Sequence, residues 1–261
     1  MKKLLAIVLC LAMIFALAGC GGAKTVVAEK ESAGEAVATT EEAFKEYEYT
    51  AVDTQAKALM EVNAGTADAA VVDYVMSIGS IGEGTDYEDL VVEGEGYSEE
   101  EYGIAFRKGS DLVDKVNQII LELKAEGKLE SIAANYKLQD IITAERTITP
   151  FVQATENSDY KYVMDKGELV IGITIFAPMN YYDDNDNLVG FETEFAKAVC
   201  EKLGVKAKFQ EISWAAKETE LAAKNIDCIW NGMTITPERE ENMAISVPYM
   251  QNKQVKVVKS K

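Results

Sequence analysis

The chain has 261 residues and a formal net charge of −18 at pH 7. A chain this acidic lacks the basic face that phosphate binding needs, so we expect no nucleic-acid partner. It contains no histidine, and neither a CxxC nor an HExxH pattern is present. Histidine is the commonest general base and metal ligand, and we therefore expect no metal site and no cofactor.

The first residues have the pattern of an export signal. Lys2 and Lys3 precede an apolar run, Leu4–Leu17, which is shorter than the ~20 residues that a membrane-spanning helix needs. The run ends in LAGC, which resembles the lipobox of bacterial lipoproteins. That resemblance implies a signal peptide over residues 1–19 and a lipid on Cys20 as the first mature residue. An ordinary secretory signal with a chance cysteine is the alternative.

Strand and helix patterns alternate through residues 24–137. Apolar runs bounded by turn residues predict strands, namely Thr25–Glu29, Tyr49–Asp53, Ala67–Asp73, Leu90–Glu95 and Tyr102–Lys108. Helical spacing of apolar residues predicts helices, namely Gly34–Tyr47, Thr54–Asn63 ended by Gly65, a long helix capped by Ser110, and Lys128–Tyr136.

Residues 138–159 have mixed polarity and no clean period, which predicts a linker or a loosely attached segment. Alternation then resumes, with strands at 167–174, 205–212, 226–230 and 253–260. Helices are expected at 191–203, ended by Gly204, at Trp214–Lys224, and after Thr236 as N-cap with Pro237 at the first helical position. Alternating elements predict an α/β fold with largely parallel sheets and both faces covered.

The segment IWNGMTITPER, Ile229–Arg239, carries the clearest functional signal. A strand ends, a glycine turn follows and a capped helix begins, and ligands of open α/β sheets bind where strands end in this way. Arg239 lies in the first helical turn, where a cation is disfavoured by the helix dipole, but an arginine there can hold a carboxylate through two hydrogen bonds. The alternative is a surface arginine paired with Glu238 or Glu240.

Residues 168–261 resemble the first half of the polar amino-acid-binding proteins of ABC importers, bacterial extracellular solute-binding protein family 3. The resemblance lies in GELVIGIT, NLVGFETEFAKAV, IDCIWNGMTITPERE and VPYM. The family motif glycine–x–threonine–x–threonine–x–x–arginine falls on Gly232, Thr234, Thr236 and Arg239. It implies that the Gly232 carbonyl receives the ligand ammonium, that Thr234 contacts ammonium and carboxylate, and that Arg239 clamps the carboxylate.

Residues 24–136 resemble the second half of the same family, through KTVVAEKESAGEAV, GTADAAVVDYV and the long segment from Tyr102. The resemblance implies that backbone amides of Ser32, Ala33 and Gly34 contact the ligand carboxylate, although the usual glycine is serine at Ser32. It also implies that Asp73 receives the ligand ammonium.

Two aromatic residues are expected at the walls of the site. Phe176 follows the first strand of its lobe and Trp214 opens a helix after another strand. The resemblance implies that they sandwich the ligand side chain. For Trp214 the alternative is a core or hinge aromatic, and the loop before Pro178 is one residue shorter than in the glutamine-binding members.

The two halves occur in reversed order, so we infer a circularly permuted, two-lobed, periplasmic-binding-protein-like (type II) fold. The expected organisation is a signal peptide (1–19), a smaller lobe (20–103), a crossover strand and returning helices (104–137), a linker joining the old termini (138–159) and a larger lobe (160–261). Only the Glu100–Phe106 strand is expected to join the lobes covalently. The C-terminal strand Gln254–Val258 would pair beside it, so hydrogen bonds alone would hold the second crossing and the hinge would loosen.

The resemblance implies a monomeric, extracytoplasmic, lipid-anchored binding protein that delivers a free L-amino acid to an ABC permease. An enzyme on the same fold, such as a periplasmic dehydratase, and a sensory module are the alternatives. Basic-amino-acid binders of the family often carry an acidic residue where this chain has Thr174, which favours a neutral polar ligand or cystine, contacted by Asn180, Asn231, Glu31 or Lys30. Cys200 and Cys228 could form a disulfide or remain free thiols.

Overall fold

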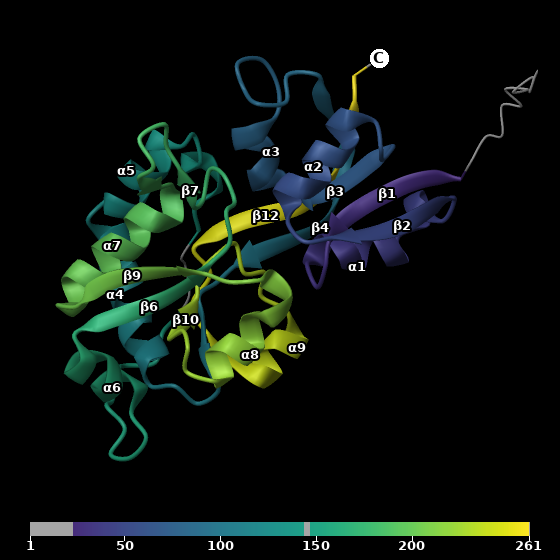
Figure 1. Cartoon of the computed structure of the whole chain (residues 1–261). Helices are drawn as coiled ribbons and strands as arrows, with labels where there is room; N and C mark the ends of the chain where they lie inside the picture. The colour runs from purple at the N-terminus through teal and green to yellow at the C-terminus, as the bar shows by residue number, and fades with distance from the viewer. Residues whose placement is uncertain (1–22, 144–146, 261) are drawn as a thin grey trace, which may run out of the picture.

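The computed structural model describes residues 23–143 and 147–260. The expected signal peptide and Cys20 lie outside these residues. Two five-stranded sheets of mixed direction organise the chain (Figure 1), together with a two-stranded sheet made of β7 (Tyr181–Tyr182) and β8 (Leu188–Val189). No helix in the described part is long and apolar enough to cross a membrane.

The smaller lobe is built on the sheet with strand order β2-β1-β3-β12-β4. Its strands in that order are β2 (Tyr47–Val52), β1 (Lys24–Glu29), β3 (Ala69–Asp73), β12 (Met250–Lys259) and β4 (Leu90–Tyr102). Strands β2 and β3 are parallel to β1, whereas β12 runs antiparallel to both β3 and β4. Its helices are α1 (Ala33–Thr40), α2 (Gln55–Ala64) and α3 (Tyr74–Ser80), with a 3₁₀ turn at Glu42–Phe44.

The larger lobe is built on the sheet with strand order β11-β5-β10-β6-β9. Its strands in that order are β11 (Met243–Ile245), β5 (Ala105–Arg107), β10 (Cys228–Ile229), β6 (Glu168–Ile173) and β9 (Lys206–Glu211). Its helices are α4 (Leu112–Ala125), α5 (Lys128–Asn135), α6 (Asp159–Lys166), α7 (Phe191–Leu203), α8 (Lys217–Ala222) and α9 (Pro237–Asn242), with 3₁₀ turns at Gln139–Ile141 and Trp214–Ala216. The predicted α/β class and two-lobed architecture are confirmed. The expectation of largely parallel sheets is wrong, because β12 and β5 run antiparallel to their neighbours in the two sheets.

Several local predictions need correction. The helix expected over Gly34–Tyr47 ends at Thr40, where the hydroxyls of Thr39 and Thr40 donate back to main-chain carbonyls and weaken the helix end. Ser110 does not cap α4. The N-cap is Asp111, and the Ser110 hydroxyl is buried without a hydrogen-bond partner in the described part.

The two lobes are joined by two continuous crossings of the chain. Strand β4 leads through Gly103 and Ile104 into β5, and β11 leads through residues 246–249 into β12. The crossings pair with each other, Tyr102 opposite Met250, and both of these residues are fully buried. The second crossing is therefore covalent, and the expectation that hydrogen bonds alone hold it is wrong. Strand β12, within the range 160–261 assigned to the larger lobe, lies in the sheet of the smaller lobe because it continues beyond the crossing to pair with β3.

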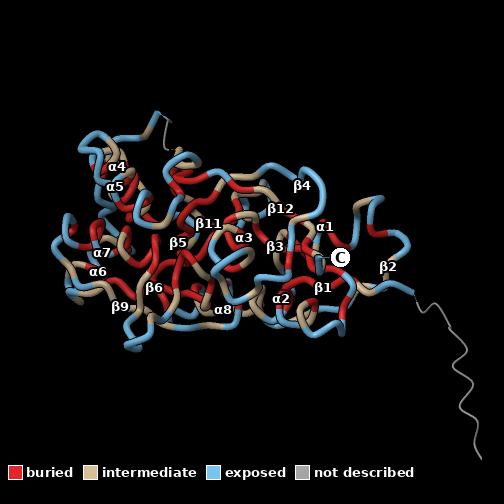
Figure 2. Tube along the Cα trace, turned by 90° about the horizontal axis from the view of Figure 1, so that it is seen from above, coloured by how far each residue is buried: buried red, intermediate tan, exposed pale blue. Residues whose placement is uncertain are grey.

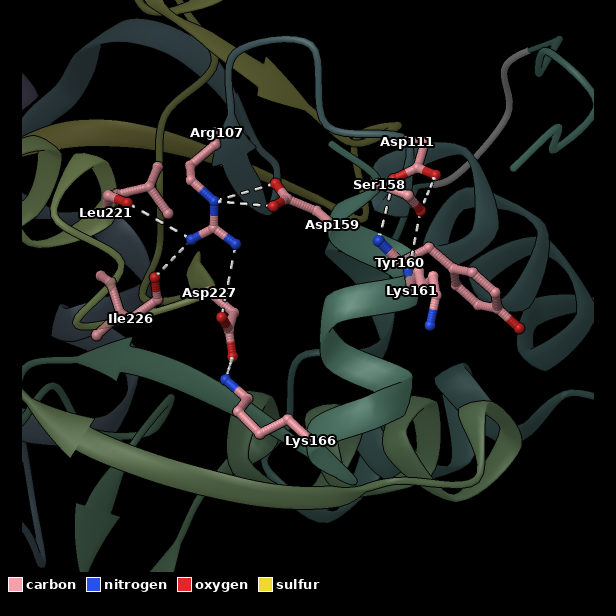
Figure 3. A network of polar contacts seen from close by, with 10 residues as sticks. All are labelled: Arg107, Asp111, Ser158, Asp159, Tyr160, Lys161, Lys166, Leu221, Ile226 and Asp227. Carbon is pink, nitrogen blue, oxygen red and sulfur yellow. Dashed lines mark hydrogen bonds and ion pairs between the residues drawn. The ribbon is translucent and has the colours of Figure 1, made fainter. Parts of the chain in front are cut away.

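The end of the expected linker is firmly attached. Arg107 on β5 donates from Nε to both carboxylate oxygens of Asp159, at 3.0 and 3.2 Å, and its Nη2 lies 3.5 Å from Asp227 (Figure 3). Lys166 at the end of α6 also pairs with Asp227. The Asp111 carboxylate accepts hydrogen bonds from the Ala154 and Tyr160 amides and the Ser158 hydroxyl. Residues 154–160 are thus held by both β5 and the start of α4.

Buried residues follow the strands of both sheets and continue through the crossings (Figure 2). An aromatic group made of Phe191, Phe195, Trp230 and Tyr249 lies where α7 meets the second crossing. Cys200 and Cys228 are both buried and both free, so the open question of a disulfide is answered in favour of thiols.

Candidate functional site

A small cavity lies between the two lobes. The smaller lobe lines it with Glu29, Ser32, Ala33, Gln55 and Asp73, and the larger lobe lines it with Trp214, Asn231, Gly232, Thr234 and Arg239. The residues implied by the family resemblance are therefore brought together, except Gly34 and Phe176. Of the further polar contacts considered, Asn231 lines the cavity, and Lys30, Glu31 and Asn180 do not. The cavity also contains Glu29 and Gln55, which the sequence analysis missed.

The position of the cavity follows from the sheet topology. Strands β1 and β3 are parallel neighbours of one sheet, and they end at Glu29 and Asp73. Strand β10 of the other sheet ends at Ile229, just before the Asn231–Thr234 turn. The carboxyl ends of strands in open α/β sheets are where ligands bind, and here such ends from both lobes face one cavity.

Arg239 reaches the cavity from the first turn of α9. Thr236 caps that helix as predicted, because its hydroxyl accepts a hydrogen bond from the Arg239 amide at 3.2 Å. The Arg239 guanidinium donates to the Thr234 carbonyl at 2.8 Å and, across the gap between the lobes, to the Glu31 carbonyl at 3.5 Å. Burial lowers the pKa of Arg239, and the charges of Glu100, Glu218 and Asp73 oppose this effect. An arginine stays protonated in either case, so the cavity has a cation at this wall.

Asp73 forms the opposite wall and is held by side-chain amides. Its carboxylate accepts hydrogen bonds from Gln55, from Asn252 at 2.6 Å and from Gln254 at 2.6 Å. Asn252 and Gln254 also donate to Glu100, so two carboxyl groups share the same pair of donors. Burial, followed by the charge of Asp73, raises the pKa of Glu100 to about 8.

Glu29 is a third carboxyl group beside Asp73. It is 4% exposed, lines the cavity, and its Oε1 has no hydrogen-bond partner in the described part of the chain. Burial is the largest cause that raises the pKa of Glu29 to about 8, and the nearby charge of Asp73 adds to it while Lys217 opposes it. The sequence does mark Glu29 as a candidate for the site, because Glu29 is the only charged residue of the TVVAE strand and stands at the carboxyl end of that strand.

The Gly232 turn requires glycine. Its φ is +58°, and a Cβ atom at this position would lie 2.6 Å from Phe176 Cε1. Phe176 is therefore buried behind the turn and supports it. Glu192 supports it too, since it accepts a hydrogen bond from the Gly232 amide at 2.8 Å and another from the Tyr249 hydroxyl. Burial raises the pKa of Glu192 to about 7.

Asn231 lines the cavity, but its side-chain amide forms hydrogen bonds with residues beneath the cavity wall. Its Oδ1 accepts hydrogen bonds from the Thr174 amide at 2.9 Å and from Asn180 at 3.0 Å, and its Nδ2 donates to the Thr174 hydroxyl. Asn180 is fully buried and also donates to Glu192 at 2.8 Å. Asn180 thus lies in the network beneath the turn and does not line the cavity.

The amides expected at the start of α1 are only partly available. Ser32 caps the helix by accepting from the Glu35 amide at 3.1 Å, while its own amide donates to the Glu29 carbonyl at 3.2 Å. Gly34 is buried, and a Cβ atom there would lie 2.9 Å from the Val71 carbonyl oxygen. Gly34 therefore permits close packing of α1 on β3.

Direct contacts also connect the lobes around the cavity. Lys217 Nζ on α8 donates to the Glu31 carbonyl at 3.4 Å and lies 4.9 Å from the centre of the Trp214 ring. A Cβ atom on Gly79 of α3 would lie 2.8 Å from Pro178 Cδ, so the other side of the gap is closed as well. The structure therefore has the two lobes in contact.

The sequence model of the bacterial extracellular solute-binding proteins, family 3, matches residues 169–261. The chain is 34% identical to the L-cystine-binding protein TcyJ of Escherichia coli (strain K12) over 88 residues, which are 33% of each chain. It is 33% identical to a probable amino-acid ABC transporter-binding protein of Haemophilus influenzae over 121 residues, 46% of each chain. It is also 34% identical to the arginine-binding extracellular protein ArtP of Bacillus subtilis over 84 residues, 32% of this chain and 33% of ArtP.

These alignments span between 33% and 46% of the relatives' own length. The relatives are named as binding proteins, and the family match covers β6 to β12 of the structure, including Trp214 and the turn from Asn231 to Arg239. Residues 169–261 of this chain are thus similar in sequence to the bacterial extracellular solute-binding proteins, family 3.

Proposed function

We propose that this chain is the extracytoplasmic substrate-binding component of an amino-acid ABC importer, which closes its two lobes around a free L-amino acid. The observation that carries the proposal is the pairing of Arg239 and Asp73 on opposite walls of one buried cavity. An α-amino acid carries a carboxylate and an ammonium group on neighbouring atoms. A cation and an anion on facing walls can compensate both charges when water is excluded.

The remaining wall residues support the same assignment. Gly232 and Thr234 come from the family-matched segment and border Arg239, and Trp214 supplies an apolar face. The relatives named above bind L-cystine and arginine or belong to amino-acid ABC transporters. Neutral polar amino acids and cystine are the ligands that the sequence analysis favours.

Isothermal titration of the mature protein with the twenty L-amino acids and cystine tests this function. We expect heat and a 1:1 stoichiometry with at least one of them. In urea denaturation, that ligand should raise the free energy of unfolding by ~2.7 kcal/mol when its concentration is one hundred times the dissociation constant. Absence of binding across the whole panel would refute the assignment. Turnover of a bound compound would favour the enzyme alternative instead.

We further propose that Cys20 carries the lipid anchor that holds the mature protein at the outer face of the membrane, near its permease. The support is the sequence pattern of residues 1–20. Cells fed a labelled fatty acid should incorporate the label into the wild-type protein and not into a Cys20→Ser variant. Equal labelling of the two proteins would exclude Cys20 as the site.

The circular permutation is also a proposal. It is supported by the position of the family match, which falls in the last third of this chain, while residues 24–136 resemble the family's second half. The smaller lobe takes strands from both ends of the described chain, β1 to β4 and then β12. In this arrangement the connection between β12 and β1 is opened within the smaller lobe, residues 138–159 join the old termini in the larger lobe, and both lobe crossings are preserved.

A further inference from the structure

Glu29 is the one ionisable residue lining the cavity that the proposed binding of an α-amino acid leaves unused. The charged residues that line the cavity are Glu29, Asp73 and Arg239. Arg239 compensates the ligand carboxylate and Asp73 its ammonium. The cavity therefore retains one carboxyl group more than a zwitterion can satisfy.

The environment of Glu29 makes this surplus costly. Its side chain is almost fully buried at the carboxyl end of β1, and Oε1 lacks a hydrogen-bond partner among the described residues. A buried carboxylate without a donor is strongly disfavoured. A group that enters the cavity with an N–H donor and a positive charge would remove that penalty.

Lys217, the cation whose charge acts on Glu29, does not fill this role. Lys217 is close enough to Glu29 for its charge to oppose the rise in the Glu29 pKa. Its ammonium, however, donates to the Glu31 carbonyl and lies over the Trp214 ring. An aromatic face that accepts one ammonium group can also accept the cationic end of a ligand side chain.

We propose that Glu29 determines the ligand class, because its carboxylate accepts a hydrogen bond from a cationic side chain, an amine or a guanidinium, of the bound L-amino acid. This inference rests on the proposed function. It replaces the neutral polar ligand or cystine favoured by the sequence. That expectation looked for an acidic residue at Thr174, which lies beneath Asn231, whereas the Glu29 carboxyl group comes from the opposite lobe.

The test uses ligand pairs that differ in charge but closely match in shape. L-arginine is compared with L-citrulline, in which a neutral urea replaces the guanidinium, and L-lysine is compared with L-2-aminoheptanoic acid, in which a methyl group replaces the ammonium. Titration calorimetry of the wild-type protein should show the cationic member binding about tenfold or more tightly, as expected for loss of a charge-assisted hydrogen bond. In a Glu29→Gln variant that preference should disappear.

Glu238→Gln is the matched control. It removes the same charge next to Arg239 from an exposed position that does not line the cavity, and it should leave the arginine-to-citrulline preference unchanged. Equal or tighter binding of citrulline by the wild type would overturn the inference and leave the proposed function intact. Retention of the preference in Glu29→Gln would overturn the role of Glu29. Failure of every amino acid to bind would instead count against the proposed function.

A pH series on the wild-type protein gives a second readout that needs no variant. The groups whose charges act on Glu29 are Asp73 and Lys217, and burial raises the Glu29 pKa to about 8. Affinity for arginine should therefore rise from pH 6 to pH 8, by up to about tenfold per pH unit, as the carboxyl group ionises. Glu100, which shares its amide donors with Asp73, has its pKa raised to about 8 as well. The readout is therefore the arginine-to-citrulline affinity ratio, which should rise over this range. An arginine-to-citrulline ratio that stays constant from pH 6 to pH 8 would contradict the proposal.

Discussion

Arg239 and Asp73 are the two side chains on which binding should depend most strongly. A buried zwitterion needs both of its charges compensated, and truncating one partner of a buried charge pair costs ~2–5 kcal/mol. We expect Arg239→Ala and Asp73→Ala each to weaken amino-acid binding about thirtyfold or more. Titration calorimetry measures the affinity, and circular dichroism checks that the fold is kept.

Arg239→Lys is the informative companion to the alanine variant. It keeps the positive charge and loses the planar pair of donors that a carboxylate accepts. We expect its affinity to lie between those of the wild type and Arg239→Ala. An Arg239→Ala protein that binds as tightly as the wild type would remove the carboxylate clamp from the proposed site.

Three buried carboxyl groups should make stability depend on pH. Burial raises the pKa values of Glu29 and Glu100 to about 8 and that of Glu192 to about 7, from 4.5. Between pH 4.5 and 8 the folded protein keeps protons that the unfolded chain has lost. The free energy of unfolding should therefore fall as pH rises through this range and level off above it.

Urea unfolding at pH 5, 6, 7 and 8 measures this dependence without ligand. Glu100→Gln should reduce the fall, since it removes one of the titrating groups while leaving an oxygen to accept from Asn252 and Gln254. A free energy of unfolding that is constant or rises over this range would contradict the assigned pKa directions.

The sequence predicts the anchors of the site but not the groups around them. Arg239, Thr234 and Gly232 belong to one short motif, so a single stretch of sequence identifies them. Gln55, Asn252 and Gln254 meet Asp73 from two other elements, α2 and β12. No local spacing signals such a meeting, because it depends on β12 lying next to β3 in the folded sheet. Phe176 was expected to line the cavity but packs behind the Gly232 turn. An aromatic residue just after a strand suits either place, so the sequence alone does not distinguish them.

Helix α6 illustrates how one ion pair can fix an element. Asp159 and Arg107 have side chains only 9% and 12% exposed, and breaking a buried pair by removing one partner costs ~3–5 kcal/mol. We expect Asp159→Ala to lower the free energy of unfolding by about 3 kcal/mol, as measured by urea denaturation.

Asp165→Ala is the control within the same helix. Asp165 pairs with Lys161, but these side chains are 65% and 60% exposed, and an exposed pair contributes less than ~1 kcal/mol. A loss of stability in Asp165→Ala as large as that in Asp159→Ala would show that the helix, and not the buried pair, accounts for the effect.

Elements with strong periodicity were predicted well, and those defined by tertiary contacts were not. Strands β1, β3 and β6 are apolar runs that the sequence marks clearly, and α7 ends at Gly204 as expected. Helix α6 was missed because its eight residues carry only one fully buried apolar side chain, Val163. Its Ser158 cap was readable in the sequence, but its attachment through Arg107 was not.

Both crossings between the lobes are continuous chain, so the proposed permutation should leave hinge behaviour unchanged. Rejoining Lys261 to Lys24 through a short flexible linker and opening the chain after Val152, which is 75% exposed, would restore the family order. We expect the rearranged protein to bind amino acids with the wild-type affinity and to show the same open–closed distribution by small-angle scattering.

If the rearranged protein were more often closed than the wild type, the reversed order of the two halves in this chain would loosen the hinge even though both crossings are intact. Failure of the rearranged chain to fold, checked by circular dichroism, would count against the permutation itself. The prediction differs from the one made on the sequence because β12 carries the second crossing into the smaller lobe.

The same sheet order has a mechanical consequence. Because β12 is antiparallel to β3, which is parallel to β1, the first residue of β1 and the last residue of β12 lie at the same end of the sheet, away from the cavity. A pull applied between Lys24 and Lys259 would peel β1 and β12 from their neighbours one hydrogen bond at a time, starting at that far end. The larger lobe, inserted between β4 and β12, would bear no load until their pairing had opened. In a single-molecule stretching experiment the smaller lobe should therefore yield first and at low force, and the larger lobe should follow as a separate event.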